Sequence, residues 1–130
     1  MTRTLTVGAA QLGPIQKSEG RVSVVNRLLS LMTRAKDKGC NLIVFPELAL
    51  TTFFPRYFMQ DQTEVDEWFE STIPNQDTQA LFDAAQRYDM AFHLGYAEKI
   101  VEDGETHRYN TAILVDRAGD IVAKYRKVHL

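Results

Sequence analysis

A glutamate that directly follows a short apolar run is the first candidate for chemistry. Glu47 comes after Pro46, at the end of the run 42–45, Leu-Ile-Val-Phe. If this run is a strand of an open α/β sheet, Glu47 lies at its carboxyl end, where such folds bind ligands. Partial desolvation beside an aromatic loop is expected to raise the pKa of this carboxyl group toward the range of a general base. A loop glutamate with only a local hydrogen bond explains the position equally well.

The second candidate is a lysine near the C-terminal end of the sequence. Lys127 lies in the basic segment 124–130, Lys-Tyr-Arg-Lys-Val-His-Leu. A basic cluster near a terminus is usually a solvated end. In a strand, however, Lys124 and Arg126 share one face whereas Lys127 points to the other, so the run is not a single solvated stripe. His129, two residues after Lys127, can reach the same pocket.

Cys40, the only cysteine, is a nucleophile by residue type but is badly placed. It stands at the amino end of the strand that leads to Glu47, and the extended residues between them span roughly 23 Å. We therefore expect a buried structural thiol. His93, His107 and His129 fall on different predicted elements without metal-ligand spacing. We expect His93 to be a hydrogen-bonded strand residue and His107 to be solvated, and we expect no metal site.

An aromatic loop follows Glu47 and offers candidates for substrate binding. Phe53, Phe54, Tyr57 and Phe58 can wall a pocket, and Arg56 is placed to meet a substrate carboxylate. A local cluster that only anchors an irregular loop is the alternative.

The composition is that of a folded globular protein and narrows the classes of partner. The chain has 130 residues, 45% of them hydrophobic, with 15 Lys and Arg against 17 Asp and Glu. This near-neutral balance gives no electrostatic reason to expect nucleic acid or an anionic membrane as partner. No run approaches the ~20 apolar residues of a membrane span, and residues 1–7 lack the apolar core of a signal peptide. We expect a cytoplasmic protein.

The elements that must position these residues begin with a βαβ unit. Alternation predicts a strand over 4–10. An apolar stripe predicts a helix over 18–38, capped by Ser18; the stripe consists of Val22, Val25, Leu28 or Leu29, Met32 and Ala35. The run 42–45 reads as a strand buried on both faces. The pair is therefore parallel, with a right-handed crossover.

The second half of the sequence predicts two more helices and three more strands. A short helix beginning at Thr63 carries Trp68 and Phe69, and another runs from 77 or 78 to 88. The strands are expected at 90–96, 111–115 and 121–125, joined by a charged turn at 101–106 and a hairpin loop at 117–120 with Gly119 at positive φ.

Two segments together resemble a known family. Segment 41–48, Asn-Leu-Ile-Val-Phe-Pro-Glu-Leu, resembles the first signature of the nitrilase (carbon–nitrogen hydrolase) superfamily, and segment 124–130 resembles the second. Segments 7–11 and 109–112 fit the same pattern, as does the order of the signatures. Within the superfamily, segment 47–56 most resembles the N-carbamoyl-D-amino acid amidohydrolases.

The resemblance implies a fold, a reaction and roles for several residues. The fold is an α/β, four-layer α-β-β-α sandwich, and residues 1–130 match its N-terminal half as a partial domain. The reaction is cleavage of a non-peptide C–N bond by a Glu-Lys-Cys triad through a thioester, without cofactor. Glu47 matches the general base and Lys127 the cation that stabilises the oxyanion, while His129 supports the site or contacts substrate. The family's cysteine lies on a later strand that Cys40 does not match, so we expect these residues alone to be inactive.

Two other classes of function stay open. Half of a two-sheet sandwich leaves one apolar sheet face uncovered, so the chain can instead be a non-catalytic, truncated or partner-dependent module. We expect a homo-oligomer in either case. A small nucleotide-binding α/β domain is the third reading, against which stands the absence of a phosphate-binding loop.

Overall fold

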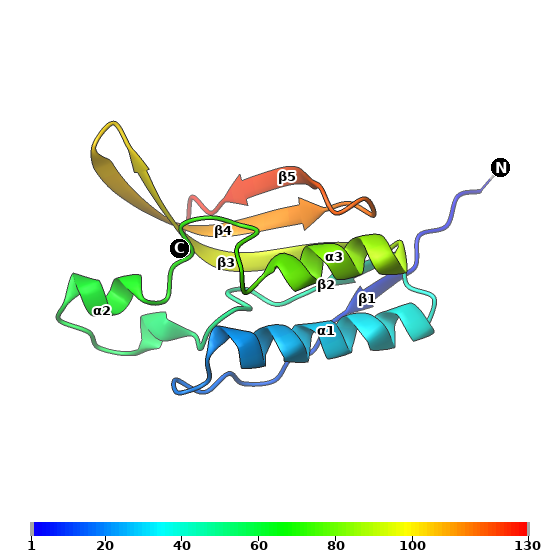
Figure 1. Ribbon diagram of the computed structural model, residues 1–130, viewed down its shortest axis with the longest axis horizontal. Coiled ribbons are helices and arrows are strands. Elements are labelled where there is room, and N and C mark those ends of the chain that lie inside the picture. The colour runs from blue at the N-terminus through cyan, green and yellow to red at the C-terminus, as the bar shows by residue number, and fades with distance from the viewer. Residues whose placement is uncertain (1, 130) are drawn as a thin grey trace.

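A single mixed sheet forms the centre of the computed structural model, which describes residues 2–129. Its strands are β1 (Val7–Ala9), β2 (Leu42–Val44), β3 (Ala91–Glu102), β4 (Glu105–Val115) and β5 (Ile121–Arg126). They lie side by side in sequence order (Figure 1). The first three are mutually parallel, whereas β4 and β5 follow as antiparallel neighbours. The predicted parallel pair at the N-terminal end is therefore confirmed.

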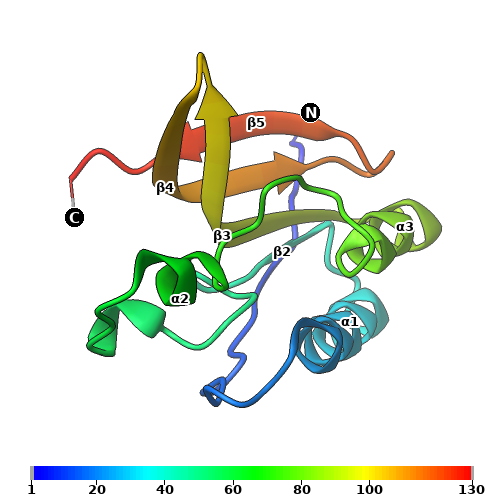
Figure 2. The same cartoon turned by 60° about the vertical axis from the view of Figure 1, so that its left-hand side comes forward.

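Two helices cover one face of this sheet. Helices α1 (Arg21–Asp37) and α3 (Gln79–Tyr88) lie side by side beneath it (Figure 2). Most of the predicted stripe of α1 is buried, but Val22 is 61% exposed and Val24, one turn before Leu28, takes its place. The strands contribute buried side chains from the face toward the helices: Ile43, Phe92, Leu94, Ile113 and Val115.

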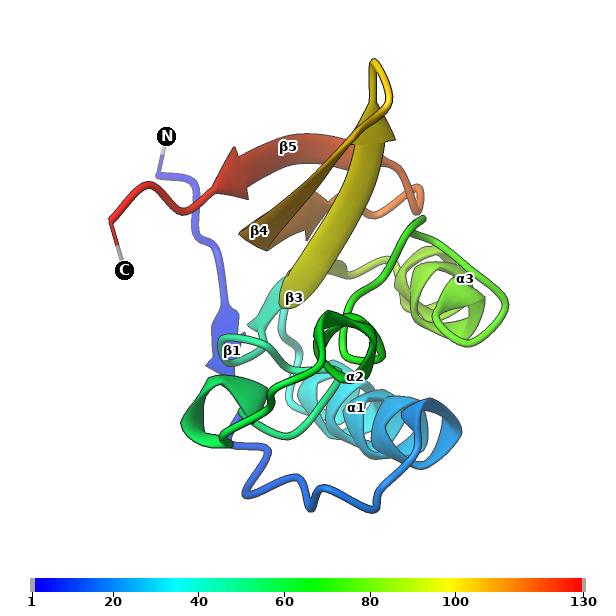
Figure 3. The ribbon, with the colours of Figure 1, turned by 90° about the vertical axis from the view of Figure 1, so that its left-hand side faces the viewer.

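The other face of the sheet carries small and apolar side chains that are only partly buried. Leu42 and Val44 point to this face and are half-buried, so the prediction that their strand is buried on both sides is wrong for the described residues. Val7 on β1 is 49% exposed and Tyr125 on β5 is 61% exposed. Within residues 2–129 no helix lies over this face (Figure 3). None of the described helices has the length and apolarity to cross a membrane.

The N-terminal elements are shorter than predicted. Strand β1 pairs only from Val7 to Ala9, because its partner β2 is itself three residues long. Helix α1 begins at Arg21 with Gly20 at the N-cap position, not at Ser18. The carboxylate of Glu19 accepts hydrogen bonds from Ser23 and Arg27 and so fixes the first turns of the helix.

The β3–β4 hairpin is longer than predicted and projects beyond the rest of the sheet (Figure 1). Its turn is Asp103-Gly104, with φ values of 52° and 77°. An Asp-Gly pair with both φ angles positive forms the two-residue turn that matches strand twist. This dipeptide is the signal that indicates continuous strands through the charged segment. The predicted β4–β5 loop is confirmed, with Gly119 at φ 85°.

The short helix predicted from Thr63 differs from the prediction at both ends. Helix α2 is Gln62–Asp66 and starts one residue before Thr63, because the carboxylate of Asp61 accepts the N–H of Thr63. Trp68 and Phe69 follow this helix, and their rings pack on Phe54 in the 3-10 turn η1 (Phe54–Arg56).

The chain that leaves β2 crosses tightly over the middle of β3. The N–H of Ala49 donates to the carbonyl of Gly95 at 2.9 Å, and Leu48 takes a positive φ of 48°. A Cβ placed on Gly95 would lie 3.1 Å from the nitrogen of Leu48 and 3.2 Å from the Cα of Glu47. The absence of a side chain at Gly95 therefore lets the backbone carry Glu47 close to the sheet.

Gly95→Ala is expected to push this crossing away from β3. Overpacking of this kind lowers the free energy of unfolding by about 1–3 kcal/mol, which urea unfolding followed by circular dichroism measures. Gly20→Ala is the matched control, because nothing lies within 4 Å of its added Cβ, and it is expected to change that free energy by less than about 1 kcal/mol. Equal stability of Gly95→Ala and the parent chain would contradict the close-approach interpretation.

Candidate active site

The structure brings Glu47 and Lys127 together across 80 positions of sequence. Glu47 lies in the segment after β2, and Lys127 directly follows β5. The Nζ of Lys127 donates to Oε1 of Glu47 at 2.8 Å, and the Nδ2 of Asn110 donates to the same oxygen at 2.6 Å. The backbone N–H of Lys127 also donates to the carbonyl of Asn110 at 2.9 Å. Asn110, on β4, thus holds both members of the pair.

The electrostatics of Glu47 differ from the expectation drawn from its position. The hydrogen bond from Lys127, followed by that from Asn110, lowers the pKa of Glu47 below its ordinary value of 4.5. The opposing effect of burial is smaller, because the side chain is 48% exposed. The expected rise in pKa is therefore wrong for this structure. The arrangement instead keeps the carboxylate ionised at neutral pH, in the form that accepts a proton.

Two cavities meet at this pair of charges. One, of about 360 Å³, lies on the face of the sheet opposite α1 and α3, called the open face below. It is lined by His93, Gly95, Tyr125 and His129 together with the pair. The other, also about 360 Å³, is walled mainly by apolar side chains of the loop after Glu47, of the segment that follows α2, and of β3 and β4: Leu48, Phe53, Phe54, Pro55, Phe69, Ala97 and Tyr109. Glu47, Asn110 and Lys127 line both cavities.

The other predicted site residues are distributed unequally around the pair. His129 lines the open-face cavity and Phe53, 49% exposed, lines the apolar one. Arg56 lines neither cavity: its guanidinium donates to the hydroxyl of Tyr57 at 2.7 Å and stacks on the same ring. Phe58 is 87% exposed. The aromatic loop therefore both walls a cavity and anchors itself.

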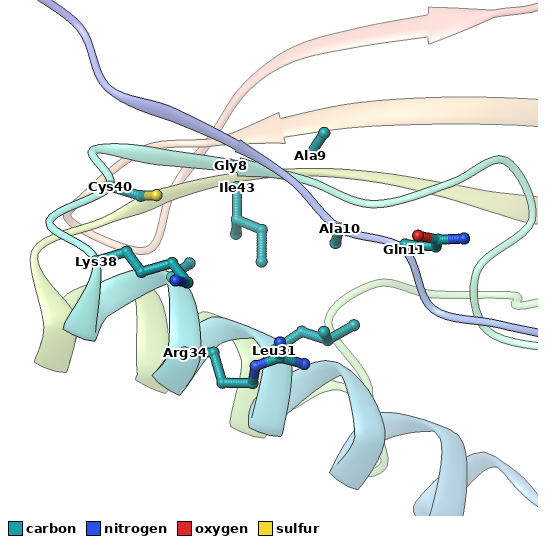
Figure 4. Close-up of a pocket in the computed structure, with 10 residues that line it drawn as sticks. Gly8, Ala9, Ala10, Gln11, Leu31, Arg34, Lys38, Cys40 and Ile43 are labelled. Atoms are coloured by element: carbon teal, nitrogen blue, oxygen red, sulfur yellow. The ribbon is translucent and has the colours of Figure 1, made fainter.

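Cys40 lies in a different cavity, beside the end of helix α1 that carries Arg34 (Figure 4). None of the residues that line this cavity lines either of the two at Glu47. Its thiol is half-buried, not fully buried as predicted, and faces Gly8, whose added Cβ would lie 3.1 Å from the sulfur. The prediction that Cys40 and Glu47 do not share a site is confirmed.

The two other histidines have distinct surroundings. His93 is on β3 as predicted, but its buried Nδ1 has no hydrogen-bond partner among residues 2–129. His107 lies on β4, with Nε2 3.8 Å from Glu105 and its ring stacked on Tyr109. In the part of the chain that the structure describes, no three His, Cys, Asp or Glu side chains form a group suited to a metal ion.

The two faces of β5 separate the basic residues of the last segment, as alternation predicted. Lys124 and Arg126 point toward the carboxylate of Glu98 on β3, whereas Lys127 points toward Glu47. Sequence reasoning did not single out Glu98 or Asn110. A strand extended from Thr111 back to Asn110 would have placed the Asn110 amide on the face of Ala112, which was the available signal.

The sequence and fold have relatives among known proteins. Residues 6–130 match the family described as Carbon-nitrogen hydrolase. Formamidases of Bacillus thuringiensis (strain Al Hakam) and Bacillus anthracis are each 26% identical over 121 residues, which cover 89% of this chain and 34% of the relative. The chain thus spans about a third of the length of these curated relatives.

Solved structures confirm the predicted α/β fold class. A carbon-nitrogen hydrolase from Helicobacter pylori G27 superimposes with a TM-score of 0.74 at 21% identity, over 96% of this chain and 40% of that one. An N-terminal amidase with an Asn-Glu-Ala peptide gives 0.71 at 23% identity, over 97% and 28%. An amidase from Nesterenkonia sp. gives 0.68 at 20%, over 97% and 43%. Because the family match extends over nearly all of its residues, this chain belongs to the carbon–nitrogen hydrolase family.

Proposed function

We propose that this chain contributes the general base and the oxyanion-stabilising cation of an enzyme that hydrolyses a non-peptide C–N bond. The observation that carries the proposal is the 2.8 Å contact between Lys127 and Glu47 in a chain of this family. Glu47 is the base and Lys127 is the cation. The nucleophile is a cysteine outside these 130 residues, since the cavity of Cys40 shares no lining residue with theirs.

The reaction proceeds through a thioester. The Glu47 carboxylate accepts the thiol proton, and the thiolate attacks the carbonyl carbon of the substrate. The negative charge that develops on the carbonyl oxygen pairs with the ammonium of Lys127. The C–N bond then breaks, and the departing amine or ammonia takes the proton back from Glu47. A water that gives its proton to Glu47 attacks the thioester, and the thiol leaves with that proton.

The substrate class is an N-carbamoyl amino acid or a related small amide. In this assignment His129 contacts substrate from the open-face cavity, and Phe53 packs on its apolar part from the other. Arg56 would bind the substrate carboxylate, for which its guanidinium must leave the Tyr57 hydroxyl. The formamidase relatives make a simple amide the natural comparison substrate.

Removal of either charge is expected to slow turnover in a full carbon–nitrogen hydrolase domain that contains residues 1–130. Glu47→Gln should lower kcat by about 10²–10⁴ through loss of the general base, and Lys127→Met by about 10²–10³ through loss of oxyanion stabilisation. Ammonia release from an N-carbamoyl amino acid and from formamide gives the rates.

The control for this assay is Glu105→Gln, a side chain that is 79% exposed on the β3–β4 hairpin and is expected to leave the rates unchanged. Full activity of Glu47→Gln would contradict the proposed base. Turnover of formamide alone would refute the carbamoyl substrate but not the reaction. Residues 1–130 by themselves should show no turnover, and an activity that Glu47→Ala abolishes would contradict the external nucleophile.

The protonation of Glu47 offers a test that does not depend on activity. Because the bonds from Lys127 and Asn110 lower its pKa, the carboxylate should persist below pH 4.5 and be lost only as the pH falls through the lowered value. Asn110→Ala removes one bond and should raise the midpoint. Carboxyl ¹³C NMR across an acid titration measures both. A midpoint above 4.5 in the parent chain would disprove the ion pair in solution.

A partner-dependent interaction module is the second candidate function, favoured by the partly exposed apolar face of the sheet. Surfaces of this kind drive association. We expect residues 1–130 to form a homo-oligomer in light scattering, and Tyr125→Lys on that face to reduce the mass. Val122→Lys, also exposed but on the other face of β5, is the matched control. A monomeric parent chain would count against this candidate.

A further inference from the structure

We propose that Glu98 is a positioning residue for Lys127, which it holds in place from the opposite face of the sheet. The inference rests on the role proposed above for Lys127. Among residues 2–129, Glu98 is the only charged residue that is buried, with 4% exposure. It does not touch Glu47 or Lys127, so its effect on them must pass through the strands.

The carboxylate of Glu98 ties together three neighbouring strands. Its Oε1 accepts hydrogen bonds from Thr111 on β4 at 2.9 Å and from Nε of Arg126 on β5 at 2.8 Å. Its Oε2 accepts from the second Arg126 nitrogen at 3.2 Å and from Lys124. A buried carboxylate with this many charge-assisted partners holds its donors in a defined geometry.

The hydrogen bonds of Glu98 reach Arg126, the residue next to Lys127. Arg126 is the last residue of β5, and its guanidinium is also stacked over the ring of Tyr109 at 4.3 Å. Because side chains alternate, fixing Arg126 toward Glu98 turns Lys127 toward Glu47. Beyond Arg126 the backbone is held to β4 by the bond from the Lys127 N–H to Asn110. Without the anchor at Arg126, the pairing of β4 with β5, that backbone bond and the ion pair with Glu47 are left to hold the lysine.

The Glu98 carboxylate is ionised at neutral pH although it is buried. Burial favours the neutral form of Glu98, but the bonds from Arg126, Lys124 and Thr111 outweigh it and lower the pKa to about 2. Removal of the carboxylate leaves Lys124 and Arg126 without their common partner. Such an uncompensated pair of cations tends to turn out to solvent, which releases the end of β5.

The direction in which the pKa of Glu47 changes shows whether the end of β5, and Lys127 with it, has moved. Loss of the negative charge at Glu98, if nothing moves, lowers the pKa of Glu47, because a nearby carboxylate disfavours ionisation. Displacement of Lys127 raises it, because the hydrogen bond from that lysine is the largest cause of its lowering. The two effects have opposite directions, so a purely electrostatic role cannot imitate a positioning role.

The experiment is carboxyl ¹³C NMR titration of residues 1–130 with Glu98→Gln. We expect the midpoint of Glu47 to rise toward the value measured with Lys127→Met, in which the ion pair is absent. Glu70→Gln is the matched control: this carboxylate pairs with Arg21 at 2.5 Å and Asn75 at 2.9 Å, and within residues 2–129 neither of these partners lies on β5. The backbone of Glu70 pairs with that of Glu98, and the substitution leaves this pairing unchanged. It should not raise the midpoint.

An unchanged or lowered midpoint in Glu98→Gln would overturn the proposal. If that variant does not fold, Thr111→Val decides, because it removes one bond to Glu98 without altering any charge. A smaller rise then supports the proposal and no rise overturns it. A failure of this kind is separate from a failure of the proposed function, which the ammonia assay of Glu47→Gln measures independently.

Discussion

The contact between Glu47 and Lys127 depends on strand direction. Strand β2 runs parallel to β3, and two antiparallel steps, through β4, return β5 to the same direction. The carboxyl ends of β2 and β5 therefore lie at the same end of the sheet, although two strands, β3 and β4, separate them. An odd number of antiparallel steps would have placed Lys127 at the opposite end of the sheet. The hairpin turns at Asp103-Gly104 and Gly119 are thus as necessary to the site as its charged residues.

Local sequence patterns predicted the strands that carry the site. They did not predict how these strands pair with one another. The apolar run before Glu47 and the alternation of Lys124, Arg126 and Lys127 are local, so they placed both charges on the correct strand ends. The role of Asn110 depends on the register between β4 and β5, which is a non-local pairing. For the same reason the burial of Glu98 could not be inferred, since its partners come from other strands.

The error in the pKa of Glu47 has a physical source as well. Position at a strand end suggested desolvation, and desolvation alone raises the pKa of a carboxyl group. The half-exposed side chain instead accepts two hydrogen bonds, one of them from a cation. A prediction of the sign requires knowledge of the partner, and the partner lies 80 positions away. Burial of β2 was overestimated in a similar way, because an apolar run does not tell which face has a cover.

Both hydrogen bonds to Glu47 end on the same oxygen, Oε1, and within residues 2–129 none ends on Oε2. The two oxygens therefore have separate roles in the proposed reaction. Oε1 fixes the orientation of the carboxyl group, and Oε2 is the proton acceptor. When Oε2 takes a proton, the carboxyl group becomes neutral and its attraction for Lys127 falls. The ammonium is then freed at the moment when negative charge appears on the substrate, so that the site exchanges one anionic partner for another and its net charge stays constant.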